Sequence, residues 1–172
     1  QEDPCFPVHF DFLGADIELI KLSPGEPFQC GDVTVHTIVQ PHHGDSYGYR
    51  FEHDNKAVVY STDAEHKLES ETETAEFVEF FKAADLVIFD AMYTMADMIS
   101  VKEDWGHSSN IIGVDLCHRA GVKHYCMFHH EPVFGDKALA DILTETIRYE
   151  EIIRDGHELK VSSAYDGLEI VI

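Results

Sequence analysis

Histidines and aspartates follow apolar runs at several points of this sequence, in positions where they could bind a metal ion. The residues concerned are His42 and His43 after "VTVHTIVQP", Asp63 after "AVVYST", Asp90 after "LVIF", and His129 and His130 after "HYCMF". Imidazole nitrogens and carboxylate oxygens are ligands for borderline-hard divalent ions such as zinc. Since strand ends on one edge of a sheet converge, the pattern predicts a metal site there.

Each of these residues also has a simpler interpretation. A single aspartate after a strand is usually a helix cap or a turn residue, and a His-His pair is more often a solvated turn than a ligand pair. The coincidence of imidazole at two strand ends and carboxylate at a third favours the metal site. Which histidine of each adjacent pair faces the metal stays open.

The segment "WGHSS" adds a different kind of group. Gly106 permits close backbone approach, and His107 comes immediately before an expected helix whose free N–H groups favour an anion. If Asp90 lies behind His107, the carboxylate fixes the imidazole tautomer and raises its pKa, as suits a general acid. Without that partner, His107 is only part of a capped turn.

The elements that must position these residues change character along the chain. Alternating or apolar β-rich runs predict strands at 15–22, 33–39, 86–93 and 122–128. Two hairpins are also predicted, one at 46–63 that turns at Asp54-Asn55 and one at 157–172. Amphipathic spacing predicts helices at 69–85, at 107–121 with Ser108 or Ser109 as N-cap and Gly121 as C-cap, and at 136–156. We therefore expect an α/β protein with a mixed sheet covered by helices on one face.

Composition limits the partners of the protein. The 172 residues carry a formal charge of −21, with 33 acidic and 12 basic residues, so the surface repels phosphate backbones and anionic membranes. A nucleic acid partner is therefore less expected than a small anionic ester. Cys5, Cys30, Cys117 and Cys126 form no C-x-x-C pair, and reduced thiols in a cytoplasmic protein are expected. No apolar run is long enough to span a membrane.

Five motifs, in this order and separation, resemble a known family. The motifs "PHHGDSYGYRFE", "VVYSTDAEH", "LVIFDAMYT", "WGHSS" and "FHHEP" are similar to the C-terminal half of metallo-β-lactamase-fold hydrolases, and most similar to the branch of tRNase Z and related phosphodiesterases. The resemblance implies an αββα sandwich in which two metal ions, commonly zinc, are held by seven ligands and a metal-bridging hydroxide attacks the substrate. Manganese or iron would be alternatives.

The resemblance also assigns roles to residues. It implies that His42 and His129 are metal ligands and that Asp63 is the bridging aspartate, with His43 and His130 as the alternatives to their neighbours. By the same resemblance, His107 contacts the scissile group and Asp90 stands behind it. The implied reaction is dinuclear metal-dependent hydrolysis of a phosphodiester or related ester.

The sequence departs from the family in one large respect. The H-x-H-x-D-H motif that supplies four ligands does not occur, so residues 1–172 are expected to form a single partial domain. We expect a fragment of a full hydrolase rather than a natural half-domain completed by a partner chain. Such a chain should bind metal weakly, expose an apolar face open to association or homo-oligomerisation, and have uncertain activity alone. A non-catalytic acidic interaction module and a mononuclear metal-binding protein are the alternatives.

Overall fold

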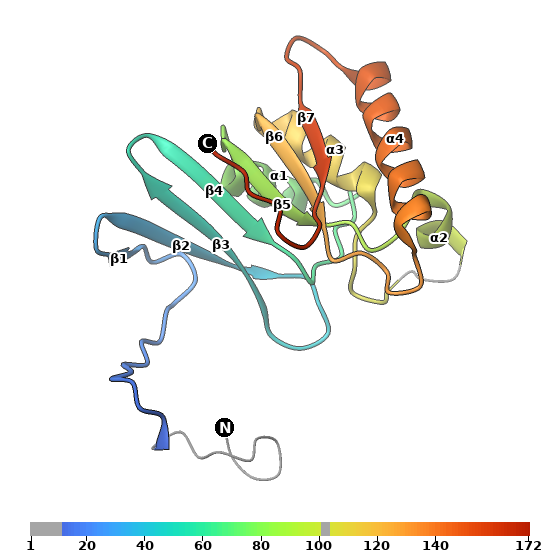
Figure 1. Cartoon of the computed structure of the whole chain (residues 1–172). Coiled ribbons are helices and arrows are strands. Elements are labelled where there is room, and N and C mark those ends of the chain that lie inside the picture. The colour runs from blue at the N-terminus through green and yellow to red at the C-terminus, as the bar shows by residue number, and fades with distance from the viewer. Residues whose placement is uncertain (1–11, 101–103) are drawn as a thin grey trace.

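One seven-stranded mixed sheet forms the body of the protein, and its helices gather on one side of that sheet (Figure 1). This computed structural model describes residues 12–100 and 104–172. The strands are β1 (Phe28–Cys30), β2 (Val33–Gln40), β3 (Ser46–His53), β4 (Lys56–Ser61), β5 (Leu86–Asp90), β6 (His124–Phe128) and β7 (Lys160–Ser163). The helices are α1 (Glu71–Phe81), α2 (Met95–Ser100), α3 (Asn110–Ala120) and α4 (Asp136–Ile153).

Strands β1 to β4 form an antiparallel meander, as the alternating sequence predicts. The β3–β4 hairpin turns on Asp54 and Asn55, whose φ angles are 48° and 60°. Two consecutive residues with positive φ match the right-handed twist of the flanking strands, and Asp and Asn tolerate that conformation. The predicted hairpin is therefore confirmed with its turn.

Strands β4 to β7 are parallel, and α1, α3 and α4 connect them in turn. Helix α3 begins where Ser109 Oγ accepts the Ile112 N–H, and it ends at Gly121, which has a left-handed φ of 67°. The side chains facing the helices are packed into a continuous core that includes Val59, Val87, Phe89, Tyr125 and Met127. A parallel sheet needs such cover because its crossover helices bury one face.

The strand directions bring four strand ends to one edge of the sheet. Strands β4, β5 and β6 are parallel, and β2 has the same direction because it is antiparallel to β3, which is antiparallel to β4. The residues that follow these four strands therefore lie along the same edge, as in other open sheets with functional sites at their carboxyl ends.

Two sequence predictions of β structure are wrong. Residues 15–22 form no strand, and Leu19 is 80% exposed, because the alternating side chains find neither a pairing partner nor a face to bury among the described residues. The predicted hairpin at 157–172 is reduced to β7: the chain then turns at Tyr165–Leu168, with Gly167 at a φ of 84°, and does not pair back on β7. Strand β1, Phe28–Cys30, lies outside every strand that the sequence predicts.

The face of the sheet opposite the helices remains partly open. Its outward side chains are largely apolar, and Val39, Tyr47, Phe51, Tyr60 and Phe128 are each between 36% and 55% exposed. The register places Val39 beside Tyr47 and Tyr49 beside Tyr60, so these side chains share one face. The apolar face expected for a partial sandwich is therefore present in the described structure.

Cys117 and Cys126 are buried, Cys30 is an exposed free thiol, and Cys5 lies outside the described residues. No helix within the described ranges combines the length and apolarity needed to cross a bilayer.

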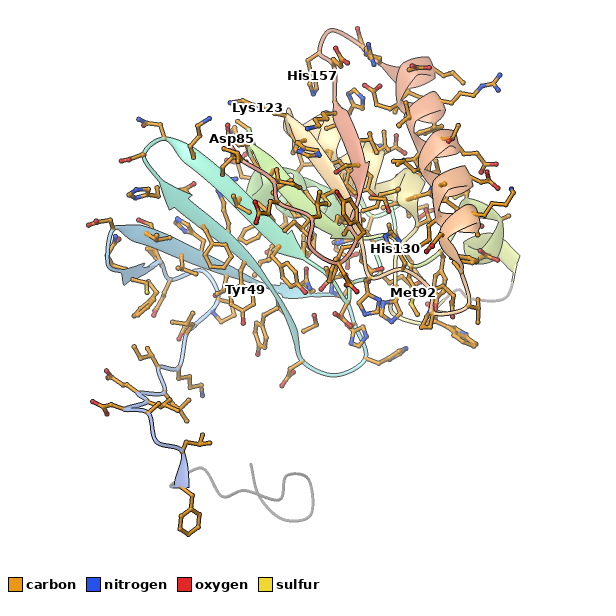
Figure 2. The ribbon with its side chains drawn as sticks, viewed as in Figure 1. Tyr49, Asp85, Met92, Lys123, His130 and His157 are labelled. Carbon is orange, nitrogen blue, oxygen red and sulfur yellow. The ribbon has the colours of Figure 1, made fainter. Side chains whose placement is uncertain are left out.

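A buried carboxylate links the amino-terminal ends of the parallel strands through hydrogen bonds. Asp85 accepts the Ala57 N–H at 2.9 Å, and the ammonium groups of Lys123 and Lys56 donate to it at 2.8 and 3.3 Å. Figure 2 shows Asp85 and Lys123 near each other, far along the sheet from His130. Burial alone would raise the pKa of Asp85, but these hydrogen bonds outweigh it and lower the pKa to about 2.

Replacement of Asp85 by asparagine should lower the free energy of unfolding by roughly 1–3 kcal/mol at pH 7. Because the folded-state pKa lies below that of the unfolded chain, the charge of Asp85 stabilises the protein fully above about pH 4 and progressively less toward pH 2. Urea unfolding should therefore show a difference between wild type and Asp85→Asn that shrinks as the pH falls. Glu79→Gln, which removes an exposed pair with Lys82, is the control, and an equal effect there would contradict the assignment.

Candidate metal centre

Five side chains converge where the four strands end, and we call them the strand-end cluster: His42, Asp63, Asp90, His107 and His129. One potential ligand atom from each of His42, Asp63 and His107 lies within 4.8 Å of the other two. The same is true of Asp90, His107 and His129. Segments separated by up to 87 positions in the chain thus meet around one small volume, because strand order and direction place their ends together.

Asp63 and His129 approach each other directly. The Asp63 Oδ1 atom is 3.2 Å from His129 Nε2. Both residues leave their strands in the left-handed conformation, with φ angles of 59° and 57°. Non-glycine residues seldom adopt positive φ, and such conformations are concentrated at functional sites. The two turns aim a carboxylate and an imidazole at the same point.

Hydrogen bonding distinguishes the members of each adjacent histidine pair. His43 Nε2 lies 2.8 Å from the carbonyl oxygen of Asp104, and His130 Nε2 lies 3.0 Å from Ser163 Oγ. Their neighbours, His42 and His129, belong to the strand-end cluster instead. In addition, the His129 Nδ1 atom is buried and has no hydrogen-bond partner. The geometry therefore favours His42 and His129 as the metal-facing histidines.

His107 and Asp90 form the pair that the sequence suggested. His107 Nδ1 donates to Asp90 Oδ2 at 2.8 Å, and Asp90 is completely buried. This hydrogen bond raises the pKa of His107 above its usual value, although partial burial opposes the shift. Since Nδ1 is occupied by Asp90, the Nε2 atom of His107 is the one available to a ligand.

The loop before His107 brings this ring close to the other two imidazoles. The His107 ring centroid is 4.8 Å from that of His129 and 5.4 Å from that of His42. Gly106 has a φ of 89°, and a Cβ there would lie 2.7 Å from His42 Cδ2. Gly106 is therefore required both for its backbone conformation and for the space that the His42 ring occupies.

Two residues that support the cluster are poorly predicted from sequence. Ser108 is not the helix cap; its hydroxyl donates to the Ala64 carbonyl at 2.6 Å and accepts the His66 N–H at 3.0 Å. Glu65 is buried and accepts N–H groups from the loop that carries His107. Burial of a charged residue two positions after Asp63 leaves no periodic signal in the sequence, so only the structure identifies Glu65.

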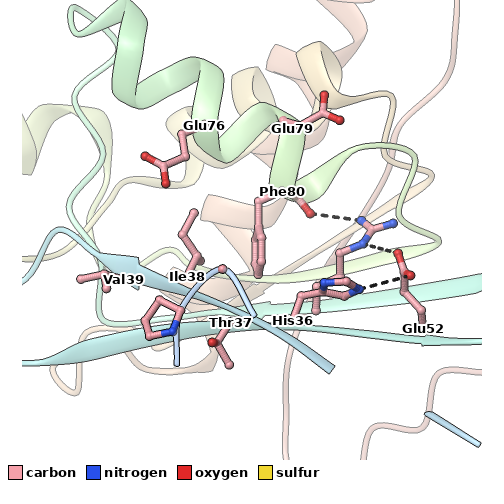
Figure 3. A pocket seen from close by; sticks show the side chains of 11 residues that line it. His36, Thr37, Ile38, Val39, Glu52, Glu76, Glu79 and Phe80 are labelled. Carbon is pink, nitrogen blue, oxygen red and sulfur yellow. Dashed lines mark hydrogen bonds and ion pairs between the residues drawn. The ribbon is translucent and has the colours of Figure 1, made fainter. Parts of the chain in front are cut away.

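A larger cavity lies elsewhere and has a different character. It has a volume of about 720 Å³ and lies between α1 and the helix-facing side of β2 and β3 (Figure 3). Three of its ionisable groups pair with one another: Arg50 Nε donates to Glu52 at 2.7 Å, and His36 lies 3.5 Å from Glu52. Glu76 and Glu79 of α1 also line it. None of the strand-end cluster lines this cavity. The cluster, rather than the larger cavity, offers a set of convergent ligand atoms.

Comparison with solved structures supports a metallo-β-lactamase fold. The metallo-β-lactamase-fold protein YhfI from Bacillus subtilis has a TM-score of 0.69 and 19% identity, over 87% of this chain and 52% of that chain. The short form of human tRNase Z has a TM-score of 0.57 and 18% identity, over 84% and 45%. A diphosphatase of the PhnP family has a TM-score of 0.58 and 17% identity, over 95% and 52%.

The chain therefore spans about half the length of these three proteins. No curated protein sequence matches it. The family model described as the β-lactamase superfamily domain matches residues 6–130, which include every member of the strand-end cluster. Most members of that superfamily are metal-dependent hydrolases that bind two metal ions. Because the match extends over more than half of the sequence and the fold agrees with it, this chain belongs to the β-lactamase superfamily.

Proposed function

We propose that this chain is part of a dinuclear metal-dependent hydrolase that acts on a phosphodiester or related ester. The observation that carries the proposal is the convergence of two imidazoles, two carboxylates and a third, differently held imidazole at one sheet edge. Family membership supports the hydrolase class, and the phosphoryl chemistry in the names of tRNase Z and the PhnP-family diphosphatase supports the ester.

The donor set fits a divalent metal ion. His42 and His129 would supply neutral imidazole nitrogens and Asp63 would supply a carboxylate that can bridge two ions, which is the ligand chemistry of zinc, with manganese or iron as alternatives. Divalent ions in such a site lower the pKa of water and polarise the substrate. Asp63 is 43% exposed and His129 30% exposed, so both can be reached from solvent.

The described residues do not complete two metal sites. In the proposal, two histidines and one shared aspartate leave each ion with fewer than the three or four protein ligands of stable zinc sites. In the proposal, a second half of the sandwich would supply the other ligands and cover the open apolar face of β2 to β6. Association with a second copy through the same face is the alternative way to bury it.

His107 would act on the substrate rather than as a structural residue. Asp90 holds the ring through Nδ1, and Asp90 is itself fixed by N–H groups of Asp63 and Ala64 at 3.0 and 3.3 Å. With its pKa raised, His107 carries a proton over more of the neutral range and can donate from Nε2 to a developing oxyanion or a leaving group. The two functions, metal binding and proton donation, would then lie on adjacent rings.

The charge of the chain favours a small substrate. A net charge of −21 offers no electrostatic attraction for a polyanion, so bulky nucleic acid is disfavoured and a small anionic ester is preferred. The bound cations would provide the local positive charge that such an ester needs.

Asp63→Ala in the full-length protein should abolish metal binding and turnover of a small phosphodiester, because both ions lose their shared ligand. Metal content by mass spectrometry and hydrolysis of bis(p-nitrophenyl) phosphate measure the two effects. Asp141→Ala, on the exposed face of α4, is the matched control and should change neither. Undiminished hydrolysis by Asp63→Ala would refute the proposal, and a single equivalent of metal in the wild type would favour the mononuclear alternative.

His107→Ala should separate the two functions of the cluster. Metal content should be retained, while kcat should fall by roughly 10²–10⁴-fold because the proton donor is lost. His53→Ala, in the exposed β3–β4 hairpin, serves as the comparison and should leave kcat unchanged. Wild-type kcat in His107→Ala would show that this imidazole does not act on the substrate.

A further inference from the structure

Glu65 connects three of the segments that meet at the strand-end cluster. Its Oε1 atom accepts the Asp104 N–H at 2.9 Å, and its Oε2 atom accepts the Gly106 N–H at 2.8 Å. Its own N–H donates to the carbonyl oxygen of Pro41 at 2.8 Å. One residue thus joins the segment after β4 to the residue before His42 and to the loop before His107.

The contact with Gly106 relates Glu65 to the spacing of two rings. The Gly106 backbone lies directly against the His42 ring, since a Cβ there would come within 2.7 Å of His42 Cδ2. His107 is the next residue, and its centroid is 5.4 Å from that of His42. A shift of the 104–106 backbone away from Glu65 would therefore move His107 and remove the packing contact between the Gly106 backbone and the His42 ring.

A carboxylate is the side chain that suits this position. Glu65 is 9% exposed, and each of its two oxygens accepts one backbone N–H. A glutamine would present an NH₂ group to one of those donors, and an alanine would leave both N–H groups without their acceptor. The Lys67 ammonium, 3.9 Å from Oε1, partly balances the buried charge.

We propose that Glu65 is a positioning residue that fixes the 104–107 loop against His42. In this way it sets the relative positions of His42, which would bind the metal ion, and His107, which would act on the substrate. The expected effect of Glu65 on metal affinity rests on the proposed function, whereas its expected effect on the position of the loop does not. Residues that orient metal ligands typically change metal affinity by 10–100-fold when they are replaced.

The test compares Glu65→Gln and Glu65→Ala with Asp85→Asn in the full-length protein. Asp85 is also a buried carboxylate that accepts a backbone N–H, but it lies at the opposite end of the strands. Zn²⁺ affinity is measured by competition with a chromophoric chelator, amide hydrogen exchange of Asp104 and Gly106 by NMR, and global stability by urea unfolding. We expect both Glu65 variants to lose 10–100-fold in Zn²⁺ affinity and to exchange faster at both amides, with the smaller effect in Glu65→Gln.

Asp85→Asn should lower stability without altering Zn²⁺ affinity or these two exchange rates. Zn²⁺ affinity within threefold of wild type in Glu65→Ala, or an equal loss of affinity in Asp85→Asn, would overturn the positioning role. If the wild-type protein itself binds no Zn²⁺, the proposed function fails. The exchange rates still test the role of Glu65 in that case, because unchanged protection of the Asp104 and Gly106 amides in Glu65→Gln would show that this carboxylate does not hold the loop.

Discussion

A single buried carboxylate, Asp90, holds the strand-end cluster together. It is completely buried at the end of β5, and it receives N–H groups from Asp63, Ala64 and Met92 as well as Nδ1 of His107. A buried charge is costly unless hydrogen bonds satisfy it. Because those donors come from separate segments, moving any segment away would leave the charge under-satisfied. The electrostatic requirement of one carboxylate thus becomes a geometric constraint on its neighbours.

The direction of the strands makes that constraint possible. Strands β2, β4, β5 and β6 end at one edge, so the residues that follow them are neighbours although the chain separates them widely. The chain leaves β4 and β6 through turns with positive φ at Asp63 and His129, which bring these two side chains toward each other. Such conformations cost energy, and at Asp63 the hydrogen bond from its N–H to Asp90 offsets part of that cost.

The two faces of the sheet differ in their exposure to solvent. The helix-covered face is a dense core, whereas the opposite face exposes aromatic side chains such as Tyr47, Phe51 and Tyr60. The chain spans about half the length of its structural relatives, and the described residues leave this apolar face partly exposed.

Local pattern was sufficient for much of the fold. The β3–β4 hairpin, the three long helices and the buried strands β5 and β6 were predictable because hydrophobic period, turn residues and helix caps act over a few neighbouring positions. The same pattern failed for residues 15–22 and for the tail after β7. A strand also needs a partner, and the partner is supplied by distant parts of the chain.

The sequence by itself determined which ligand types stand at the strand ends: imidazole at 42–43 and 129–130, and carboxylate at 63 and 90. Only the tertiary structure decided which histidine of each pair faces the cluster, because His43 and His130 bond to Asp104 and Ser163, far away in sequence. It also decided that Glu65 is buried beneath the His107 loop. Contacts between remote segments depend on how the whole sheet is assembled, and no local spacing encodes them.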